Sequence, residues 1–189
     1  LSVCATMLAG SPATGQDGPE LPEQYREPIP LHPEVLGPYS FKISSNSKGA
    51  QQFFDQGMQL MYAFAKVDAV RSFREAWKQD SDCAICYWGE AWAWGSYLNG
   101  PMRPPEAPHA YAAAQKASVL AEDGKSSTRE RSYIEALSVR YVEDFEVDKR
   151  RDQDEAYAEA MRKLTEQYPD DLDAATLYGD SLFLLEPRR

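Results

Sequence analysis

The chain has 189 residues, of which 43% are hydrophobic and 26% charged, a composition typical of a globular protein large enough to bury a core. Its formal charge of −10 argues against nucleic-acid binding, which needs a surface rich in lysine and arginine, and against adsorption on an anionic membrane surface. No stretch is long enough and apolar enough to cross a bilayer, so we expect no membrane span.

Residues 1–15 are apolar and uncharged. They resemble the end of a secretory signal peptide, with a small-residue cleavage site at 13–15. The alternative is an apolar N-terminal arm that stays in the mature protein. Residues 1–4 also resemble a lipoprotein box with Cys4 as the lipidated residue, although Val3 stands where a small residue is expected. We predict an exported protein, periplasmic or extracellular, with lipidation as the weaker alternative.

Residues 16–48 are rich in proline, which lacks an amide donor and fixes φ, so this stretch cannot form a helix or an inner strand. We expect an extended linker or a strap that lies along the rest of the domain. Near its end, residues 39–43 alternate apolar and polar side chains. This alternation predicts a short extended segment that packs Tyr39, Phe41 and Ile43 on the helices.

Helical periodicity begins near residue 49 and continues to residue 186. Apolar or small residues recur every three to four positions in two neighbouring stripes, Phe53, Gly57, Leu60 and Phe64, then Ala69, Phe73 and Ala76. These stripes predict two amphipathic helices joined by a tight turn, with Asp68 as the N-cap of the second.

Further helices are expected along the rest of the chain, over residues 83–97, 107–121, 152–167 and 171–186. One more helix is expected from the capping box formed by Ser127 and Glu130 to about residue 142. Glycine and prolines at 99–105 break the chain after the first of these helices, and Pro169 stops the helix over 152–167.

These spacings resemble those of the tetratricopeptide repeat. The first unit carries its small and large residues at the family's places, Phe53, Gly57, Leu60, Ala69, Phe73 and Ala76, with Ser81 where a proline is usual. Later units begin near Ala84, Arg129 and Leu172. The resemblance covers about three and a half repeats over residues 49–186, and residues 53–91 are similar to exported bacterial members that generally lack an assigned activity. It implies an all-α fold of tandem antiparallel helix pairs in a right-handed solenoid.

In this family the first helix of each pair lines a concave surface. The resemblance therefore implies a groove of aromatic and methionine side chains, Phe54, Met58, Tyr62, Trp88, Trp92, Tyr133 and Tyr141. Tryptophan and tyrosine are favoured at binding hot spots, so this groove is a candidate site for a protein or peptide partner. The alternative is that the strap or a neighbouring helix covers these side chains as core. The proline-rich strap is itself a candidate occupant of such a groove.

The last expected helix carries Leu182 and Phe183 but has no following helix to cover them. In a solenoid each unit buries its face on the next one, so either the sequence continues or another chain covers this face. This gives a second hypothesis, a structural subunit that self-assembles into an oligomer or fibre through the N-terminal arm and the last helix.

Cys83 and Cys86 are spaced C-x-x-C at a helix start. Two interpretations are open, a local disulfide in an exported protein or two small buried apolar residues. A zinc site would need a second ligand pair, and redox catalysis a strand–helix context, and neither is evident. With no phosphate loop and no nucleophile elbow, we predict no catalytic residue, no metal and no cofactor. We therefore expect a non-enzymatic interaction scaffold; a third hypothesis is an accessory helical domain of a larger enzyme.

Overall fold

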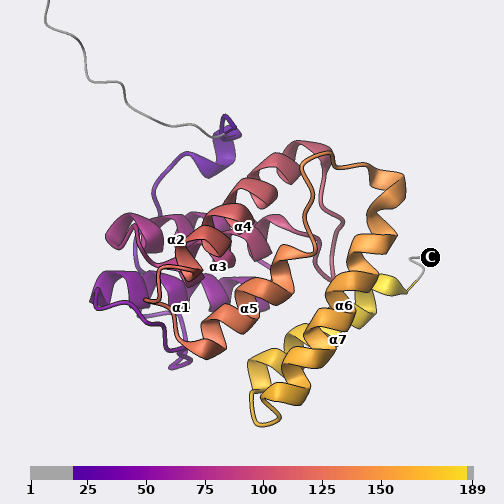
Figure 1. The fold of residues 1–189 in the computed structure, drawn as a ribbon. Helices are drawn as coiled ribbons and strands as arrows, with labels where there is room; N and C mark the ends of the chain where they lie inside the picture. Colours follow the sequence, from indigo (N-terminus) through magenta and orange to yellow (C-terminus); the bar gives the residue numbers. More distant parts are fainter. Residues whose placement is uncertain (1–18, 187–189) are drawn as a thin grey trace, which may run out of the picture.

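The structure, a computed structural model, describes residues 19–186, and this part of the chain is all-helical, as the sequence predicts (Figure 1). Its α-helices are α1 Lys48–Tyr62, α2 Lys66–Gln79, α3 Ala84–Trp94, α4 Ala107–Ala121, α5 Thr128–Ser138, α6 Arg150–Gln167 and α7 Leu172–Leu185. Short 3-10 turns lie at Glu23–Tyr25, Pro104–Glu106 and Val147–Lys149. Residues 1–15, with Cys4, lie outside the described residues. In residues 19–186 no helix is long and apolar enough to cross a membrane.

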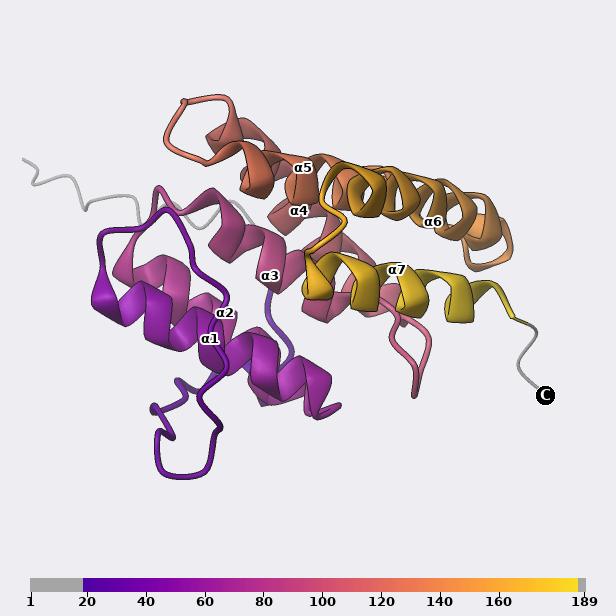
Figure 2. The ribbon, with the colours of Figure 1, turned by 90° about the horizontal axis from the view of Figure 1, so that it is seen from below.

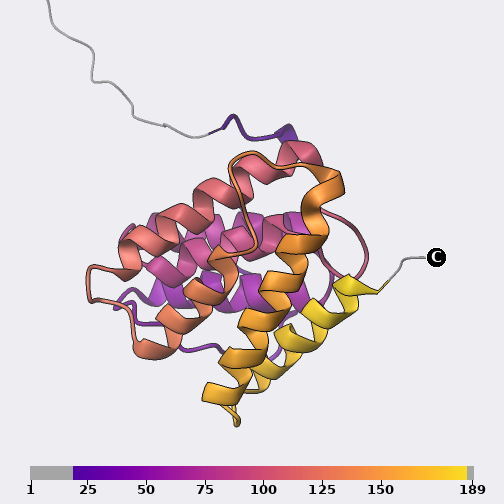
Figure 3. The ribbon, with the colours of Figure 1, turned by 45° about the vertical axis from the view of Figure 1, so that its right-hand side comes forward.

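Helices that follow one another in the chain also lie against one another in space. α1 packs on α2, α2 on α3, α3 on α4, and α6 on α7, while α5 contacts α3, α4 and α6. The views agree that α1 and α2 lie at one side of the molecule and α6 and α7 at the other, with α3 to α5 between them (Figures 1, 2 and 3). The two outer pairs still meet at one place, where Tyr62 of α1 donates a hydrogen bond to Asp173 of α7 at 2.7 Å.

Two glycines let the first three helices approach closely around one aromatic ring. A Cβ atom placed on Gly57 of α1 would lie 2.6 Å from the Phe73 ring of α2, and one on Gly89 of α3 would lie 2.4 Å from it. Both distances are shorter than a carbon–carbon contact allows, so only a residue without a side chain fits at these two positions. Phe73 is fully buried at the centre of the first three helices.

Polar caps begin several helices where the sequence predicts them. Ser127 accepts a hydrogen bond from the Glu130 amide, and the Glu130 side chain accepts one from the Ser127 amide, which completes the expected capping box. Asp171 caps α7 in the same way, by accepting from Asp173 and Ala174 amides. These caps satisfy amides at helix starts that have no partner within the helix.

Some expected helix boundaries were wrong, among them the end of the helix expected over residues 83–97, which stops at Trp94. Asp68 is not the N-cap of α2; it lies in the first turn and pairs with Arg71 at 2.9 Å. The helix expected to reach residue 142 ends at Ser138. It ends early because the next side chains are drawn into contacts with the end of α3: Arg140 donates to the Ser96 carbonyl at 2.8 Å and Tyr141 to the Ala91 carbonyl at 2.7 Å.

The segment from residue 19 to residue 47 runs along the helices with one 3-10 turn and no α-helix. Four of its side chains, Tyr25, Ile29, Phe41 and Ile43, are buried. Phe41 and Ile43 therefore pack on the helices as the sequence predicts, and Tyr39 is half-buried against the same core. The segment is part of the folded domain and contributes apolar residues to its interior.

Candidate partner-binding pocket

The expected concave groove is filled by the chain's own Phe41. The Phe41 ring centre lies 5.5 Å from that of Phe54, 6.4 Å from that of Trp88 and 5.4 Å from that of Tyr133. The Arg129 guanidinium lies over the Phe41 ring, 3.9 Å from its centre. An aromatic side chain thus occupies the place where the resemblance implies a partner.

Polar side chains of the helices hold the backbone of this segment in place. The Phe41 amide donates to Asp55 at 2.9 Å, and Gln51 both donates to the Phe41 carbonyl at 2.9 Å and accepts from the Ile43 amide at 3.0 Å. The Ser44 amide donates to Glu130 at 2.7 Å. Because its backbone groups are paired and its apolar side chains buried, we treat the segment as a fixed part of the core.

Six of the seven expected groove residues are buried, and five of them lie in the core rather than in an open groove, as the alternative interpretation expects: Phe54, Met58, Trp88, Tyr133 and Tyr141. Their physical role is packing, since they lie under Phe41 or against the middle of the fold. The remaining two, the half-buried Tyr62 and the buried Trp92, line a separate cavity.

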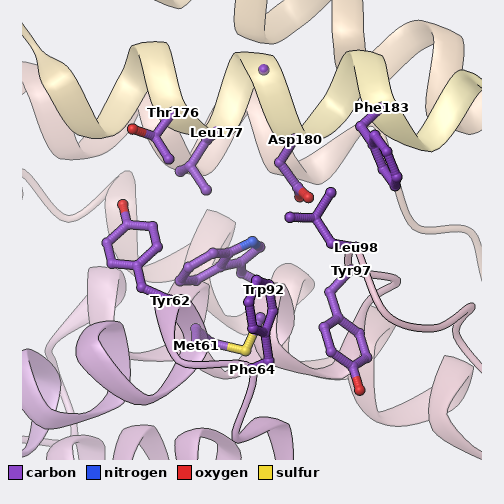
Figure 4. A pocket seen from close by; sticks show the side chains of 11 residues that line it. Met61, Tyr62, Phe64, Trp92, Tyr97, Leu98, Thr176, Leu177, Asp180 and Phe183 are labelled. Atoms are coloured by element: carbon purple, nitrogen blue, oxygen red, sulfur yellow. The ribbon is translucent and has the colours of Figure 1, made fainter.

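That cavity lies between the first helix pair, the end of α3 and the last helix (Figure 4). Its volume is about 420 Å³, within the range of natural ligand pockets. It is lined by the end of α1, α3 and its following loop, and α7, through Met61, Tyr62, Phe64, Trp92, Tyr97, Leu98, Thr176, Leu177, Gly179, Asp180 and Phe183. The lining is mostly aromatic and aliphatic, with Asp180 as its charged member.

The turn after α1 presents Phe64 to this pocket in an unfavourable backbone conformation. Phe64 has a φ of 63°, a left-handed value at which helices usually place glycine. The Phe64 amide donates to the Met61 carbonyl at 2.9 Å and the Ala65 amide to the Leu60 carbonyl at 2.8 Å, so the turn is a Schellman motif. A bulky residue costs about 1–2 kcal/mol there, yet the side chain stays 45% exposed.

Trp92 forms the floor of the pocket. Its ring stacks on Trp88 at 5.6 Å and meets the Tyr62 ring edge-on at 5.8 Å. The side chain is 3% exposed, and its indole N–H has no hydrogen-bond partner. Figure 4 shows this nitrogen on the side of the ring that faces α7 and Asp180. A buried donor without a partner costs about 1–3 kcal/mol. The Trp92 nitrogen therefore departs from the rule that buried donors are hydrogen-bonded.

The loop after α3 brings Tyr97 and Leu98 to the pocket. It is tied by paired backbone hydrogen bonds between Tyr97 and Gly100 at 3.0 and 3.1 Å. Its far end is anchored by Glu106, which accepts from Lys66 at 3.0 Å and from the Arg103 amide at 2.8 Å. Leu98 remains 36% exposed at the rim.

Burial and neighbouring charge shift the pKa values of Glu106 and Lys66 in opposite directions. Burial alone would raise the pKa of Glu106, but hydrogen bonds from Arg103 and the charge of Lys66 lower it below its usual range. Burial lowers the pKa of Lys66, and Glu106 opposes that shift. Lys66 also donates to the Trp94 carbonyl at 2.9 Å. A paired, hydrogen-bonded charge can be held inside the fold, and here it fixes the loop that carries Leu98.

α7 is positioned over the pocket by its N-terminal end. Asp171 accepts from Arg129 of α5 at 2.6 Å, and Asp173 accepts from the hydroxyls of Tyr39 and Tyr62, each at 2.7 Å. Burial and the negative charge of Asp173 raise the pKa of Tyr62, so its phenol remains a donor in this bond. These bonds join the last helix to α1 and α5 through side chains.

Leu182 and Phe183 are 44% and 46% exposed, as their place on the last helix predicts. Phe183 lines the pocket, whereas Leu182 does not. The two residues therefore belong to different surfaces, although the sequence groups them as one assembly contact.

The sequence patterns do not point to several of the pocket residues, among them Tyr97, Leu98, Thr176 and Asp180. They come from a loop and from the last helix, whose position depends on long-range contacts that the sequence does not display. One local signal was present: Phe64 stands just after the first helix, where a glycine or asparagine is usual.

Cys83 and Cys86 form a disulfide at the start of α3, with an S–S distance of 2.00 Å. Both side chains are also buried, so each of the two interpretations of this pair describes part of the arrangement. Within residues 19–186, no three His, Cys, Asp or Glu side chains gather in a way that could hold a metal ion. No family model, curated protein or solved structure matches this chain.

Proposed function

We propose that this protein is a non-enzymatic, tetratricopeptide-like scaffold that binds a partner protein or peptide in the pocket between α1, α3 and α7. The observation that carries the proposal is the combination of an apolar cavity of about 420 Å³ with half-exposed Phe64, Leu98 and Phe183 around it. Large apolar side chains that stay exposed around a concave site are typical of interaction surfaces.

The repeat architecture is supported by the packing of the first helices. Gly57 lies where the resemblance expects a small residue, and Gly89 of the next unit contacts the same Phe73 ring. Consecutive helices also pack as neighbours, as stacked helix pairs do. We propose on this basis that the helix pairs wind as a right-handed solenoid and that residues 19–47 form a strap filling part of its concave face.

The backbone of Phe64 is a second support for a binding role. A left-handed Phe is unfavourable for folding, and its ring is not fully buried in return. Such local strain clusters at functional sites, where the side chain is needed for a contact outside the fold.

The test compares what the immobilised full chain captures from the proteins of its source with what two pocket variants capture. Phe183→Asp and Leu98→Asp each place a charge at the rim, and Val119→Asp places the same charge at a more exposed residue of α4 outside the pocket. We expect specific partners to be lost from both rim variants and retained by Val119→Asp. Equal capture by all four proteins would contradict the proposed site.

Self-assembly is a second candidate function, because Leu182 and Leu172 expose apolar side chains on α7 outside the pocket. It predicts that light scattering shows an oligomer that dissociates in Leu182→Asp and persists in Val119→Asp. A monomer at every concentration would remove this candidate and leave binding of another protein.

We also propose that the protein is exported. The Cys83–Cys86 disulfide supports this, since disulfides persist mainly in oxidising compartments. Mass spectrometry after alkylation in denaturant tests it on protein purified from its source. The two cysteines should react only after reduction; reaction without a reductant would count against an oxidising location.

A further inference from the structure

We infer that the pocket receives a tyrosine side chain of the partner, whose phenol hydroxyl accepts a hydrogen bond from the Trp92 indole N–H and donates one to the Asp180 carboxylate. This inference rests on the proposed partner-binding function and specifies the chemistry that the same pocket recognises.

The unpartnered N–H of Trp92 gives the first requirement. It is buried, it has no acceptor within residues 19–186, and it faces the pocket side of the ring (Figure 4). A group that completes this bond must carry a hydrogen-bond acceptor. Lysine and arginine side chains carry donors only, and purely apolar side chains carry neither, so these occupants would leave the N–H unsatisfied.

Asp180 gives the second requirement. Its carboxylate points from α7 into the same part of the pocket as the Trp92 nitrogen (Figure 4). A carboxylate offers about four acceptor sites, so it can take a further donor whatever else it contacts. The negative charge of Asp180 would repel a carboxylate or phosphate of the partner. A carbonyl group, which can only accept hydrogen bonds, could not donate to the Asp180 carboxylate. The occupant must therefore both accept and donate while carrying no negative charge.

The walls of the pocket give the third requirement. Tyr62, Phe64, Tyr97 and Phe183 surround the space with aromatic rings. Hydroxyls and primary amides both accept and donate, but an aromatic body packs better among these rings than the short chain of an amide. A tyrosine side chain combines a flat apolar ring, which can pack among these walls, with a hydroxyl at its end that can both accept and donate.

The test uses three matched probes on the full chain: N-acetyl-L-tyrosinamide, its O-methyl ether and N-acetyl-L-phenylalaninamide. The ¹H–¹⁵N spectrum reports on the indole N–H groups, and the Trp92 signal is identified by its loss in Trp92→Phe. We expect the tyrosine probe to shift the Trp92 signal and to bind roughly fivefold or more tighter than the phenylalanine probe, the ratio that one or two added hydrogen bonds supply. The methyl ether, which accepts but cannot donate to Asp180, should bind with intermediate affinity.

Asp180→Asn keeps the size of the side chain and removes its charge. It should reduce the advantage of the tyrosine probe over the methyl ether, and Glu122→Gln, an exposed carboxylate on α4's C-terminal end, should leave that advantage unchanged. Equal binding of the tyrosine and phenylalanine probes with an unmoved Trp92 signal would overturn the inference, while the proposed partner site would stand if the rim variants still lose their partners. Failure of all three probes would also overturn it. Loss of the rim effect in the capture comparison would instead overturn the proposed function itself.

Discussion

At the scale of single residues, Phe64 is where folding and the proposed function conflict. Its left-handed backbone favours glycine or asparagine, yet a phenylalanine stands there with its ring at the pocket. We predict that Phe64→Asn keeps the turn and changes the free energy of unfolding by no more than about 1 kcal/mol in either direction, since relief of strain offsets lost ring contacts.

Denaturant unfolding measures this change, and the capture comparison measures function in the same variant. Partner capture should fall although the fold survives. A variant that is strongly destabilised would show that Phe64 serves packing, and a variant that captures partners normally would remove it from the site.

Gly57 provides a second prediction at this scale. Alanine is a better helix former than glycine by about 1 kcal/mol, but its Cβ would lie 2.6 Å from the buried Phe73 ring. Because that ring cannot move without displacing the core, we expect overpacking to dominate and Gly57→Ala to destabilise the fold by about 1–3 kcal/mol.

Gly179 is the matched control for Gly57, because it also lies inside a helix, but a Cβ there meets no atom within 4 Å. Gly179→Ala should raise the free energy of unfolding by roughly 0.5–1 kcal/mol. Thermal unfolding of both variants checks the pair. Stabilisation by Gly57→Ala would mean that α1 and α2 are not as close as the structure has them.

His109 gives the fold a dependence on pH. Its imidazole stacks on the Trp94 ring at 4.7 Å, and burial lowers its pKa below the ordinary value of 6.5. The unfolded chain therefore binds a proton more readily than the folded one. This contribution to stability is complete above pH 6.5 and is lost as the pH falls from there through the folded pKa.

The free energy of unfolding, measured from pH 7.5 down to about pH 5, should fall in the wild type and fall less steeply in His109→Gln. His32, the other histidine of the chain, is exposed, so His32→Gln should follow the wild-type curve. Parallel curves for all three proteins would show that His109 is not held as a neutral buried group.

At the scale of elements, the extended segment before α1 decides what the concave face can do. Phe41 is 1% exposed and contacts rings from α1, α3 and α5. Removing a buried phenylalanine ring costs about 3–5 kcal/mol, so Phe41→Ala should destabilise the whole domain by that amount. Lys42→Ala, one residue away and exposed, should have little effect.

Denaturant unfolding followed by tryptophan fluorescence measures both variants. If Phe41→Ala stays as stable as the wild type, the segment is a removable ligand of the groove and the expected open groove is restored as a hypothesis. A cooperative loss of stability would show that the segment belongs to the core.

The helices themselves were largely predictable, because their signals are local. The capping box of Ser127 and Glu130, the alanine-rich helix over 107–121 and the extended proline-rich stretch all follow from patterns within a few residues. The early end of α5 was not predictable, since it depends on Arg140 and Tyr141 reaching the end of α3. Boundaries set by tertiary contacts carry no local signal.

The candidate site was predictable only in part for a similar reason. An aromatic side chain on the inner face of a helix has the same sequence pattern whether it lines a groove or a core. Phe54 and Trp88 proved to be core because one ring, Phe41, reaches them from outside the repeats. Tyr62 and Trp92 line a cavity together with α7, and the position of that helix is defined only in the folded chain.

At the scale of the whole molecule, the fold joins three parts of the chain at one pocket. α7 is held there by side-chain bonds from Arg129 and Tyr62, and the loop after α3 by the buried pair of Lys66 and Glu106. The chain carries a net charge of −10, which favours neutral or basic partners and disfavours acidic ones.

Photo-crosslinking in cells that make the protein can show whether a partner occupies the pocket, with a photoreactive residue in place of Leu98 at the pocket rim or of Val119 on α4. Both positions are exposed, and only Leu98 lines the pocket. If the pocket binds a partner protein, position 98 should give a crosslinked partner and position 119 none. A crosslink from position 119 alone, or a crosslink from position 98 only to a second copy of this chain, would contradict it.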